Sequence, residues 1–202
     1  MALFITFEGG EGSGKSVQAR ALYRRLSQLA IPALLTQEPG GTPLGKKIAR
    51  WLKWEKTAIS PLSELLLFNA SRAELVAEVI QPSLENGKIV ICDRYADSTA
   101  AYQSYGRGLD LKTVKSINHA ATQGLEPDLT LLLDMPAETG LARKRVQKQD
   151  RFEREALAFH QRVRESYLKM AANDPKRWLV VDASQPRAKV TEIIWDKVKQ
   201  LL

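Results

Sequence analysis

The sequence predicts an α/β fold, in which helices flank a five-stranded parallel sheet. Five short apolar segments alternate with longer stretches whose apolar residues recur every three or four positions. This alternation is typical of parallel strands joined by right-handed crossover helices. A glycine-rich loop also joins the first strand to the first helix, where α/β proteins of this kind hold phosphate groups. We expect residues 1–202 to form a single domain.

The glycine-rich loop follows the first predicted strand, Leu3–Phe7, and matches the phosphate-loop pattern G-x-x-x-x-G-K-[ST]. Glycine permits positive φ angles, so backbone N–H groups can converge on phosphate oxygens at a helix N-terminus. We expect Lys15 to reach the β- and γ-phosphates of a nucleoside triphosphate and Ser16 to bind Mg²⁺. The predicted nucleotide-binding residues are Gly9, Gly10, Glu11, Gly12, Ser13, Gly14, Lys15 and Ser16.

The first helix and the second strand lead into a dense turn. Apolar residues keep helical spacing over Val17–Leu29, and Leu34–Thr36 is the second predicted strand. The strand ends in a turn where Thr42 can cap a helix that begins with Pro43. Glu38 in this turn is either a carboxylate that acts on a substrate or on metal-bound water, or a solvated loop residue.

A long helix is predicted from Ser60-Pro61, a second cap of this kind, to the break at Asn86-Gly87. Phe68 and Arg72 are four residues apart and therefore share one face of this helix. An aromatic ring and a guanidinium on one face could stack on a nucleobase and hydrogen-bond to its edge. Their spacing alone favours a simpler interpretation, a core phenylalanine beside a surface arginine.

The clearest strand, Lys88–Cys92, is followed directly by Asp93 and Arg94. A carboxylate at the end of a buried strand beside a phosphate loop is positioned to support Mg²⁺ or to accept a proton. Arg94 could hold a phosphate group with two parallel hydrogen bonds. Hydrogen-bonding side chains with helical spacing come next, either over a ligand cleft or on a polar surface helix. They are Ser98, Thr99, Tyr102 and Gln103.

The last third of the chain adds two predicted strands, Leu129–Asp134 and Trp178–Asp182. Asp134 is either a second metal carboxylate or, as the simpler interpretation, a structural cap. Basic side chains crowd residues 143–154, a segment that is either a mobile lid or a solvated basic helix. The last two predicted helices are an amphipathic one over Phe152–Met170 and a final one over Val190–Leu202.

The composition argues against several classes of protein. A single cysteine, Cys92, excludes a disulfide framework, and its place in an apolar strand predicts an inert buried thiol. We see neither a signal-peptide pattern nor a run of 18 apolar residues, so we expect a cytoplasmic protein with no membrane partner. The net charge of +7 suits a protein that handles phosphates, and without an aromatic-interleaved basic stripe we expect no nucleic-acid partner. The sequence has no His/Cys cluster, so its metal would be Mg²⁺ carried with nucleotide phosphates.

Together these motifs resemble the bacterial thymidylate kinases, which have the P-loop kinase fold and phosphorylate dTMP to dTDP with ATP. The resemblance runs nearly from end to end, and its combination of motifs is far more specific than the phosphate loop. The segments that carry it are Phe7–Ser16, Glu38–Pro43, Leu67–Arg72, Asp93–Gln103 and Asp150–Glu153.

The resemblance implies how the base and sugar of dTMP would be held. Phe68 would stack on thymine, Arg72 would contact its carbonyl edge and Gln103 its ring nitrogen. Tyr102 would crowd the 2′ position of the sugar and so favour the deoxy form. Polar contacts made only with the right ligand discriminate strongly.

The resemblance also implies how the phosphates would be held. Glu11 would face the 3′-hydroxyl of dTMP, and Arg94 would hold the dTMP phosphate and help to join donor to acceptor. Ser98 belongs to the same set of substrate-binding residues. Glu38 and Asp93 would lie near this phosphate and the Mg²⁺, and which of the two acts through water stays open.

Members of this family carry a catalytic arginine either in the phosphate loop or in the lid. Gly12 stands at the loop position, so the resemblance implies a lid arginine. The segment before Asp150 lacks the glycine that is common in such lids. The register of the lid is therefore left open, and Arg145 is the first choice, with Arg143 or Arg151 as alternatives. The lid is expected over about residues 143–153, and the resemblance implies a homodimer.

The implied reaction is an in-line attack of a dTMP phosphate oxygen on the γ-phosphorus of ATP. Catalysis would depend on positioning and charge neutralisation, and its predicted residues are Lys15, Arg94, Arg145 and Asp93. Two rival interpretations are a kinase of the same fold for another metabolite, and a nucleotide switch or nucleic-acid-dependent ATPase. Activity with a panel of nucleotides separates all three.

Overall fold

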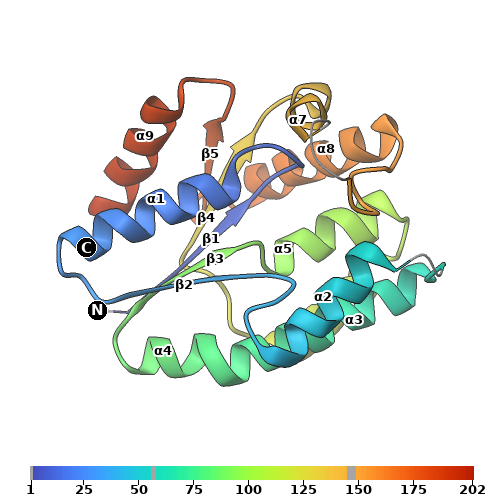
Figure 1. The fold of residues 1–202 in the computed structure, drawn as a ribbon, viewed down its shortest axis with the longest axis horizontal. Helices are drawn as coiled ribbons and strands as arrows, with labels where there is room; N and C mark the ends of the chain where they lie inside the picture. The colour runs from blue at the N-terminus through green and yellow to red at the C-terminus, as the bar shows by residue number, and fades with distance from the viewer. Residues whose placement is uncertain (1, 56–57, 145–148) are drawn as a thin grey trace.

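The computed structural model describes residues 2–55, 58–144 and 149–202, and its centre is a five-stranded parallel sheet with strand order β2-β3-β1-β4-β5 (Figure 1). Every neighbouring pair of strands is parallel. The predicted fold class is confirmed, and each strand lies within one residue of its predicted bounds. The strands are β1 (Leu3–Glu8), β2 (Ala33–Gln37), β3 (Ile89–Asp93), β4 (Leu129–Asp134) and β5 (Trp178–Asp182).

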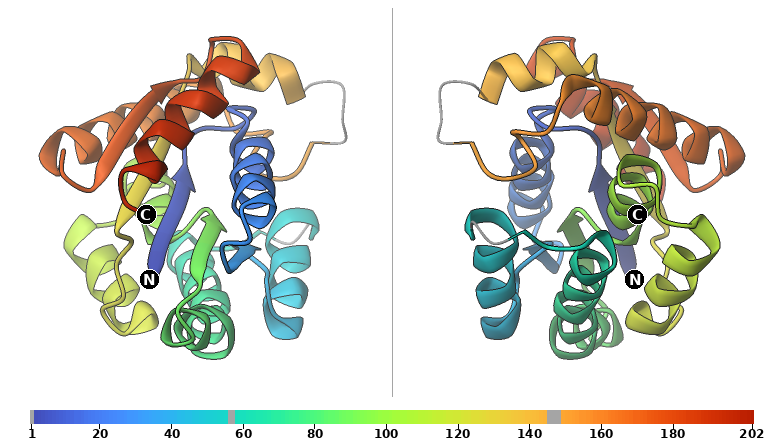
Figure 2. Two further views of the ribbon diagram at one scale, coloured as in Figure 1. Left: turned by 90° about the vertical axis from the view of Figure 1, so that its left-hand side faces the viewer. Right: turned by 90° about the vertical axis from the view of Figure 1, so that its right-hand side faces the viewer.

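Helices lie on both sides of the sheet (Figure 2). Because alternate residues of a strand point to opposite faces, Ile5 of β1 packs with α1 (Lys15–Gln28) and α9 (Arg187–Lys199), whereas Phe4 packs with the helices of the other face. Cys92 belongs to that second layer, is fully buried, and has the raised thiol pKa that burial causes. The burial that the sequence predicts for this thiol is confirmed.

The remaining helices include two π-helical segments, each continuous with α-helix. The predicted caps are confirmed: the Thr42 side chain accepts the N–H of Gly45 at 2.9 Å, and the Ser60 side chain accepts the N–H of Ser63 at 3.2 Å. None of the helices in the described residues is both long enough and apolar enough to cross a bilayer. The remaining elements are α2 (Pro43–Trp54), α3 (Pro61–Leu75), η1 (Val76–Ile80), α4 (Gln81–Glu85), α5 (Ala96–Thr99), η2 (Ala100–Gly106), α6 (Leu111–Thr122), α7 (Ala137–Lys144) and α8 (Leu157–Asn173).

Two predictions about local structure are wrong. The helix predicted from Phe152 begins at Leu157, because the Asp150 carboxylate accepts the backbone N–H groups of Phe152 and Glu153 at 2.9 and 3.0 Å and holds a turn there. Asp134 does not cap a helix with its side chain. Its carboxylate instead forms an ion pair with Arg164 of α8 at 2.7 Å, which joins β4 to that helix.

Candidate active site

The loop between β1 and α1 is shaped by glycines with positive φ. The φ angles of Gly9, Gly12 and Gly14 are 139°, 69° and 93°, which residues with a side chain rarely adopt. A Cβ at Gly12 would lie only 2.0 Å from the carbonyl oxygen of Gly140 in α7. The loop backbone therefore packs directly on α7, and no arginine fits at position 12.

The Lys15 ammonium lies inside this loop. It donates to the carbonyl oxygens of Gly9 at 3.0 Å and Gly10 at 2.7 Å. Burial, and then the nearby charge of Arg94, lower the pKa of Lys15 to about 8. At neutral pH the side chain stays a cation, held in the loop where a phosphate group would bind.

Ser16 and Asp93 meet at the carboxyl end of the sheet, where the Ser16 hydroxyl donates to Asp93 Oδ2. A hydroxyl and a carboxylate side by side are hard oxygen ligands of the kind that Mg²⁺ prefers. No group of three or more side chains suited to a metal ion occurs in the described ranges. A Mg²⁺ held by this pair would thus take most of its ligands from phosphate groups and water. The pair lines a cavity of about 430 Å³ beside the phosphate loop, which we call the phosphate cavity.

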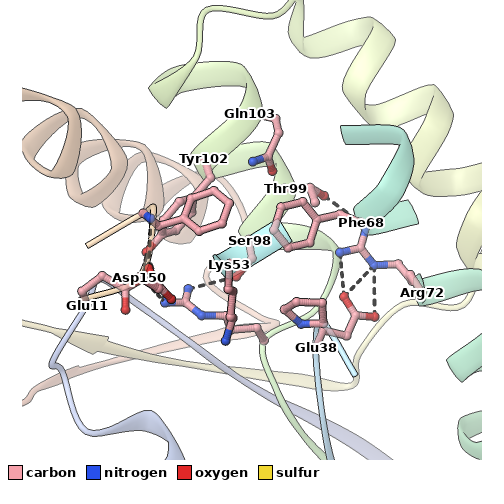
Figure 3. A pocket seen from close by; sticks show the side chains of 13 residues that line it. Glu11, Glu38, Lys53, Phe68, Arg72, Ser98, Thr99, Tyr102, Gln103 and Asp150 are labelled. Atoms are coloured by element: carbon pink, nitrogen blue, oxygen red, sulfur yellow. Dashed lines mark hydrogen bonds and ion pairs between the residues drawn. The ribbon is translucent and has the colours of Figure 1, made fainter. Parts of the chain in front are cut away.

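A second cavity, which we call the acceptor pocket, opens next to the phosphate cavity (Figure 3). All eight side chains predicted to bind substrate line the acceptor pocket. They come from the phosphate loop, the turn after β2, helix α3, the end of β3, and the α5–η2 segment. They are Glu11, Glu38, Phe68, Arg72, Arg94, Ser98, Tyr102 and Gln103.

Arg94 links the two cavities. Its NH2 group donates to Glu11 Oε1 at 2.7 Å and to the Tyr102 hydroxyl at 3.2 Å, and its NH1 group donates to Gly9 O at 3.2 Å and Ser98 Oγ at 3.3 Å. Burial disfavours the charged form of Glu11, but Arg94 and then Lys15 outweigh burial and lower the Glu11 pKa to about 2. Glu11 is therefore a charged carboxylate that can accept a hydrogen bond from a hydroxyl group of a ligand.

The backbone at Arg94 is strained and is held by β1. Its φ angle is +74°, in the left-handed region that costs a residue with a side chain about 1 kcal/mol or more. The Arg94 N–H donates to Phe7 O at 3.0 Å, and the next N–H, of Tyr95, donates to Glu8 Oε1 at 2.8 Å. These two bonds hold the turn that aims Arg94 into the pocket.

Glu8 is a site residue to which the sequence analysis assigned no role. Its Oε2 accepts the hydroxyls of Ser98 at 2.6 Å and Tyr167 at 2.8 Å. Full burial, and then the charge of Asp97, raise its pKa to about 7. The signal available in the sequence was its place at the end of a buried strand, the criterion that singled out Asp93.

Arg72 corrects the simpler sequence interpretation, because it is buried rather than on the surface. It is 1% exposed and forms an ion pair with Glu38 at 2.7 Å. Its NH1 group donates to the side chains of Asn69, Thr99 and Asn118. The Glu38 side chain is 3% exposed, so it is not a solvated loop carboxylate, and burial raises its pKa against the opposing effect of Arg72.

Gln103 is held by Glu64, another residue to which the sequence analysis assigned no role. Gln103 Nε2 donates to Glu64 Oε1 at 2.8 Å. Because a carboxylate only accepts, this contact assigns the amide orientation and leaves Gln103 Oε1 as an acceptor. Glu64 also accepts from Arg107 at 3.2 Å and from Arg151 at 2.5 Å.

Comparison with known proteins agrees with this geometry. A sequence model of the family described as thymidylate kinase matches residues 7–194. The thymidylate kinase of Dehalococcoides mccartyi strain CBDB1 is 57% identical to the chain, covering 100% of it and 98% of that protein. The chain belongs to the thymidylate kinase family. The thymidylate kinase of Thermomicrobium roseum is 50% identical, covering 100% of this chain and 97% of that one. The crystal structure of thymidylate kinase from Ehrlichia chaffeensis has a TM-score of 0.81 at 34% identity and covers 98% of both chains.

The three arginines that the sequence analysis considered for a lid lie in different surroundings. Arg145, the first choice from the sequence, lies outside the described residues. Arg143 lines the phosphate cavity. Arg151 forms an ion pair with Glu64 at 2.5 Å, and its guanidinium lies over the ring of Phe152 at 5.0 Å. Phe152 lines the acceptor pocket, so this guanidinium lies on the side of that pocket.

Proposed function

We propose that this enzyme transfers the γ-phosphoryl group of ATP to dTMP, giving dTDP and ADP. One observation carries the proposal: the eight predicted substrate-binding side chains line one pocket directly beside the phosphate loop. Family membership supports the same reaction, since the relatives that match over the full chain are named thymidylate kinases. ATP would bind on Gly9–Ser16, and dTMP would bind in the acceptor pocket.

Recognition of thymine would depend on the orientation of Gln103. With its Nε2 held by Glu64, Gln103 Oε1 would accept the N3–H of thymine. Cytosine has an unprotonated N3, so two acceptors would face each other and cytosine would be rejected. Phe68, half-buried in the pocket wall, would stack on the base, and Arg72 would contact its carbonyl edge.

The sugar and phosphate of dTMP would lie toward Arg94. The charged Glu11 would accept the 3′-hydroxyl, while Tyr102, whose hydroxyl donates to Glu11 at 2.8 Å, would crowd the 2′ position. Arg94 would hold the dTMP phosphate with Ser98 beside it, and Glu38 would keep Arg72 in place.

The transfer step would need positioning and charge neutralisation more than proton transfer. A dTMP phosphate oxygen would form a bond to the γ-phosphorus of ATP as the bond between that phosphorus and the β,γ-bridging oxygen breaks and ADP leaves. Lys15, Arg94 and a lid arginine, with Arg145 as first choice within about residues 143–153, would stabilise the transferring group. Ser16 and Asp93 would hold Mg²⁺, which would neutralise phosphate charge when bound.

The proposal includes a single domain, a cytoplasmic enzyme that does not bind nucleic acid, and a homodimer. Large exposed apolar side chains in the described residues gather on α2 and α3, including Trp51 at 40%, Leu62 at 47% and Leu66 at 49% exposure. Because a second copy of the chain would bury this surface, the pattern supports a dimer that forms through these two helices.

The testing experiment measures ADP formation from ATP and Mg²⁺ with dTMP, dUMP, dCMP, dGMP, AMP or no acceptor. We expect strong activity with dTMP, weaker activity with dUMP and little with the others. High activity with another acceptor would indicate a kinase of the same fold for that metabolite. Equal rates in every reaction, or stimulation by DNA, would instead indicate a nucleotide switch or a nucleic-acid-dependent ATPase.

A further inference from the structure

The acceptor pocket and the phosphate cavity share five lining residues, which we call the junction: Glu11, Glu38, Lys53, Arg94 and Asp150. The attacking phosphate of an acceptor nucleotide has to lie at the junction, because it is bound from one side and reacts toward the other. Three of the five residues are acidic, and the two cations are Arg94 and Lys53. Among the described residues, these two are the cations that line both cavities.

The two cations differ in whether they already form an ion pair within the protein. Arg94 forms an ion pair with Glu11 at 2.7 Å, and the nearby Arg72 forms one with Glu38 at 2.7 Å. Lys53 forms no ion pair with any residue in the described ranges. Its charge is therefore available to a ligand without the loss of an existing ion pair.

Lys53 is also held at the junction by its backbone. It lies in the last turn of α2, and its carbonyl oxygen accepts the N–H of Arg151 at 3.1 Å, which joins α2 to the turn that contains Asp150. Figure 3 shows its side chain among those of the pocket, in the view between Asp150 and Glu38.

A simpler role for a lysine at this position is to interact with the C-terminal end of the helix dipole. That role would leave the ammonium in solvent, whereas Lys53 is half-buried and lines both cavities. Its charge is also near enough to Asp150 to act against the burial that raises the Asp150 pKa. The position of Lys53 therefore fits a ligand contact better than a helix cap.

We propose that Lys53 is a substrate-binding residue that holds the phosphate group of the acceptor nucleotide together with Arg94. This inference rests on the proposed function, because it assigns a second cation to the acceptor site of the same reaction. An ammonium on a flexible stem binds phosphate as a point charge, which complements the planar guanidinium of Arg94.

The test compares the binding of dTMP and thymidine to the full-length protein by titration calorimetry. These ligands differ only in the phosphate group. In Lys53→Met, which keeps the length of the side chain, we expect dTMP to bind about 10- to 100-fold more weakly, as for the loss of a charged hydrogen bond. Thymidine binding should change by less than about twofold, and Lys53→Arg should keep most of the dTMP affinity. Lys47→Met, an exposed position on the same helix, is the matched control and should bind both ligands normally.

Two outcomes would overturn the proposal while the proposed function stands. Unchanged dTMP affinity in Lys53→Met would mean that the ammonium does not touch the phosphate. An equal loss of dTMP and thymidine affinity would mean that Lys53 shapes the pocket, for example through Asp150. A wild-type protein that does not prefer dTMP to thymidine would overturn both the inference and the proposed acceptor. Thermal melting of each variant checks that it is folded.

Discussion

At the scale of single residues, the pair of Arg72 and Glu38 belongs both to the buried interior and to the lining of the acceptor pocket. Both side chains line the acceptor pocket, yet they are 1% and 3% exposed and bonded to each other. In Arg72→Met the carboxylate of Glu38 would stay buried without its partner. We expect this to lower the free energy of unfolding by about 3 to 5 kcal/mol, measured by urea denaturation.

The matched control for this change is Arg25→Met. Arg25 forms an ion pair of the same 2.7 Å length with Glu192, but the two side chains are 34% and 59% exposed. Exposed pairs contribute about 1 kcal/mol or less, so this variant should unfold almost like the wild type. Similar losses in both variants would mean that burial does not make the Arg72–Glu38 pair special. If only Arg72→Met loses much stability, a loss of activity in this variant would not by itself show that Arg72 contacts the base.

Glu8 should give the stability of the protein a specific pH dependence. Folding raises its pKa from 4.5 to about 7, so the native state holds this proton more tightly than the unfolded state. The contribution is fully present below about pH 4.5 and is lost as the pH rises through about 7. We expect a loss of about 3 kcal/mol from this group. Urea unfolding at pH 5 and pH 8 measures it.

Glu8→Gln separates this effect from other titrating groups, because an amide keeps hydrogen-bonding capacity toward Tyr95, Ser98 and Tyr167 but does not titrate. The unfolding free energy of the variant should change less between pH 5 and pH 8 than that of the wild type. Parallel pH profiles for the two proteins would contradict a raised Glu8 pKa.

At the scale of elements, the phosphate loop and helix α7 are in close contact at two glycines, Gly12 and Gly140. A Cβ at Gly140 of α7 would lie 2.1 Å from the carbonyl oxygen of Glu11. Gly140→Ala should therefore push α7 away from the loop and lower the free energy of unfolding by about 1 to 3 kcal/mol. Chemical denaturation measures the loss. We also expect a higher KM for ATP, because the loop must shift.

Thr139→Ala is the control for this contact, because Thr139 is the preceding residue of α7 and is exposed. It should leave both stability and the KM for ATP near the wild-type values. If Gly140→Ala behaves in the same way, the loop and α7 do not depend on close contact.

Strand and cap positions could be predicted from the sequence because they depend on local signals. Apolar runs located all five strands, and Thr42-Pro43 and Ser60-Pro61 located two helix starts. The start of α8 could not be predicted in this way, because Asp150 and its two backbone contacts override the helical spacing of the apolar residues. The π-helical segment η2 could not be predicted either, because a pattern of apolar residues every 3.6 positions does not indicate where i→i+5 hydrogen bonds form.

At the scale of the whole molecule, the sheet explains why the site could be predicted at all. β1 and β3 are neighbours at the centre of the sheet, so the loops that follow them meet at one edge. The phosphate-loop pattern assigned Lys15 to that edge, and the end of a predicted strand assigned Asp93. Lys53 and Glu64 could not, because they reach the site from helix positions whose direction depends on how α2 and α3 pack.

The packing of α2 and α3 leads to a last expectation, about assembly. These helices contact each other and carry apolar side chains that are exposed in the described chain, such as Trp51 and Leu66. If a second copy buries them, a lysine there places a charge in an apolar interface. Trp51→Lys and Leu66→Lys should then turn a dimer into a monomer at micromolar concentration, as measured by sedimentation equilibrium.

The control for this change is Leu29→Lys, at the end of α1. Leu29 is 53% exposed, and this variant should stay dimeric. A monomeric wild type, or dimers in all three variants, would exclude this interface. Lys53 lies on α2, the helix that also carries Trp51, and lines the junction, so a dissociated variant that also binds dTMP more weakly would link assembly to the acceptor site.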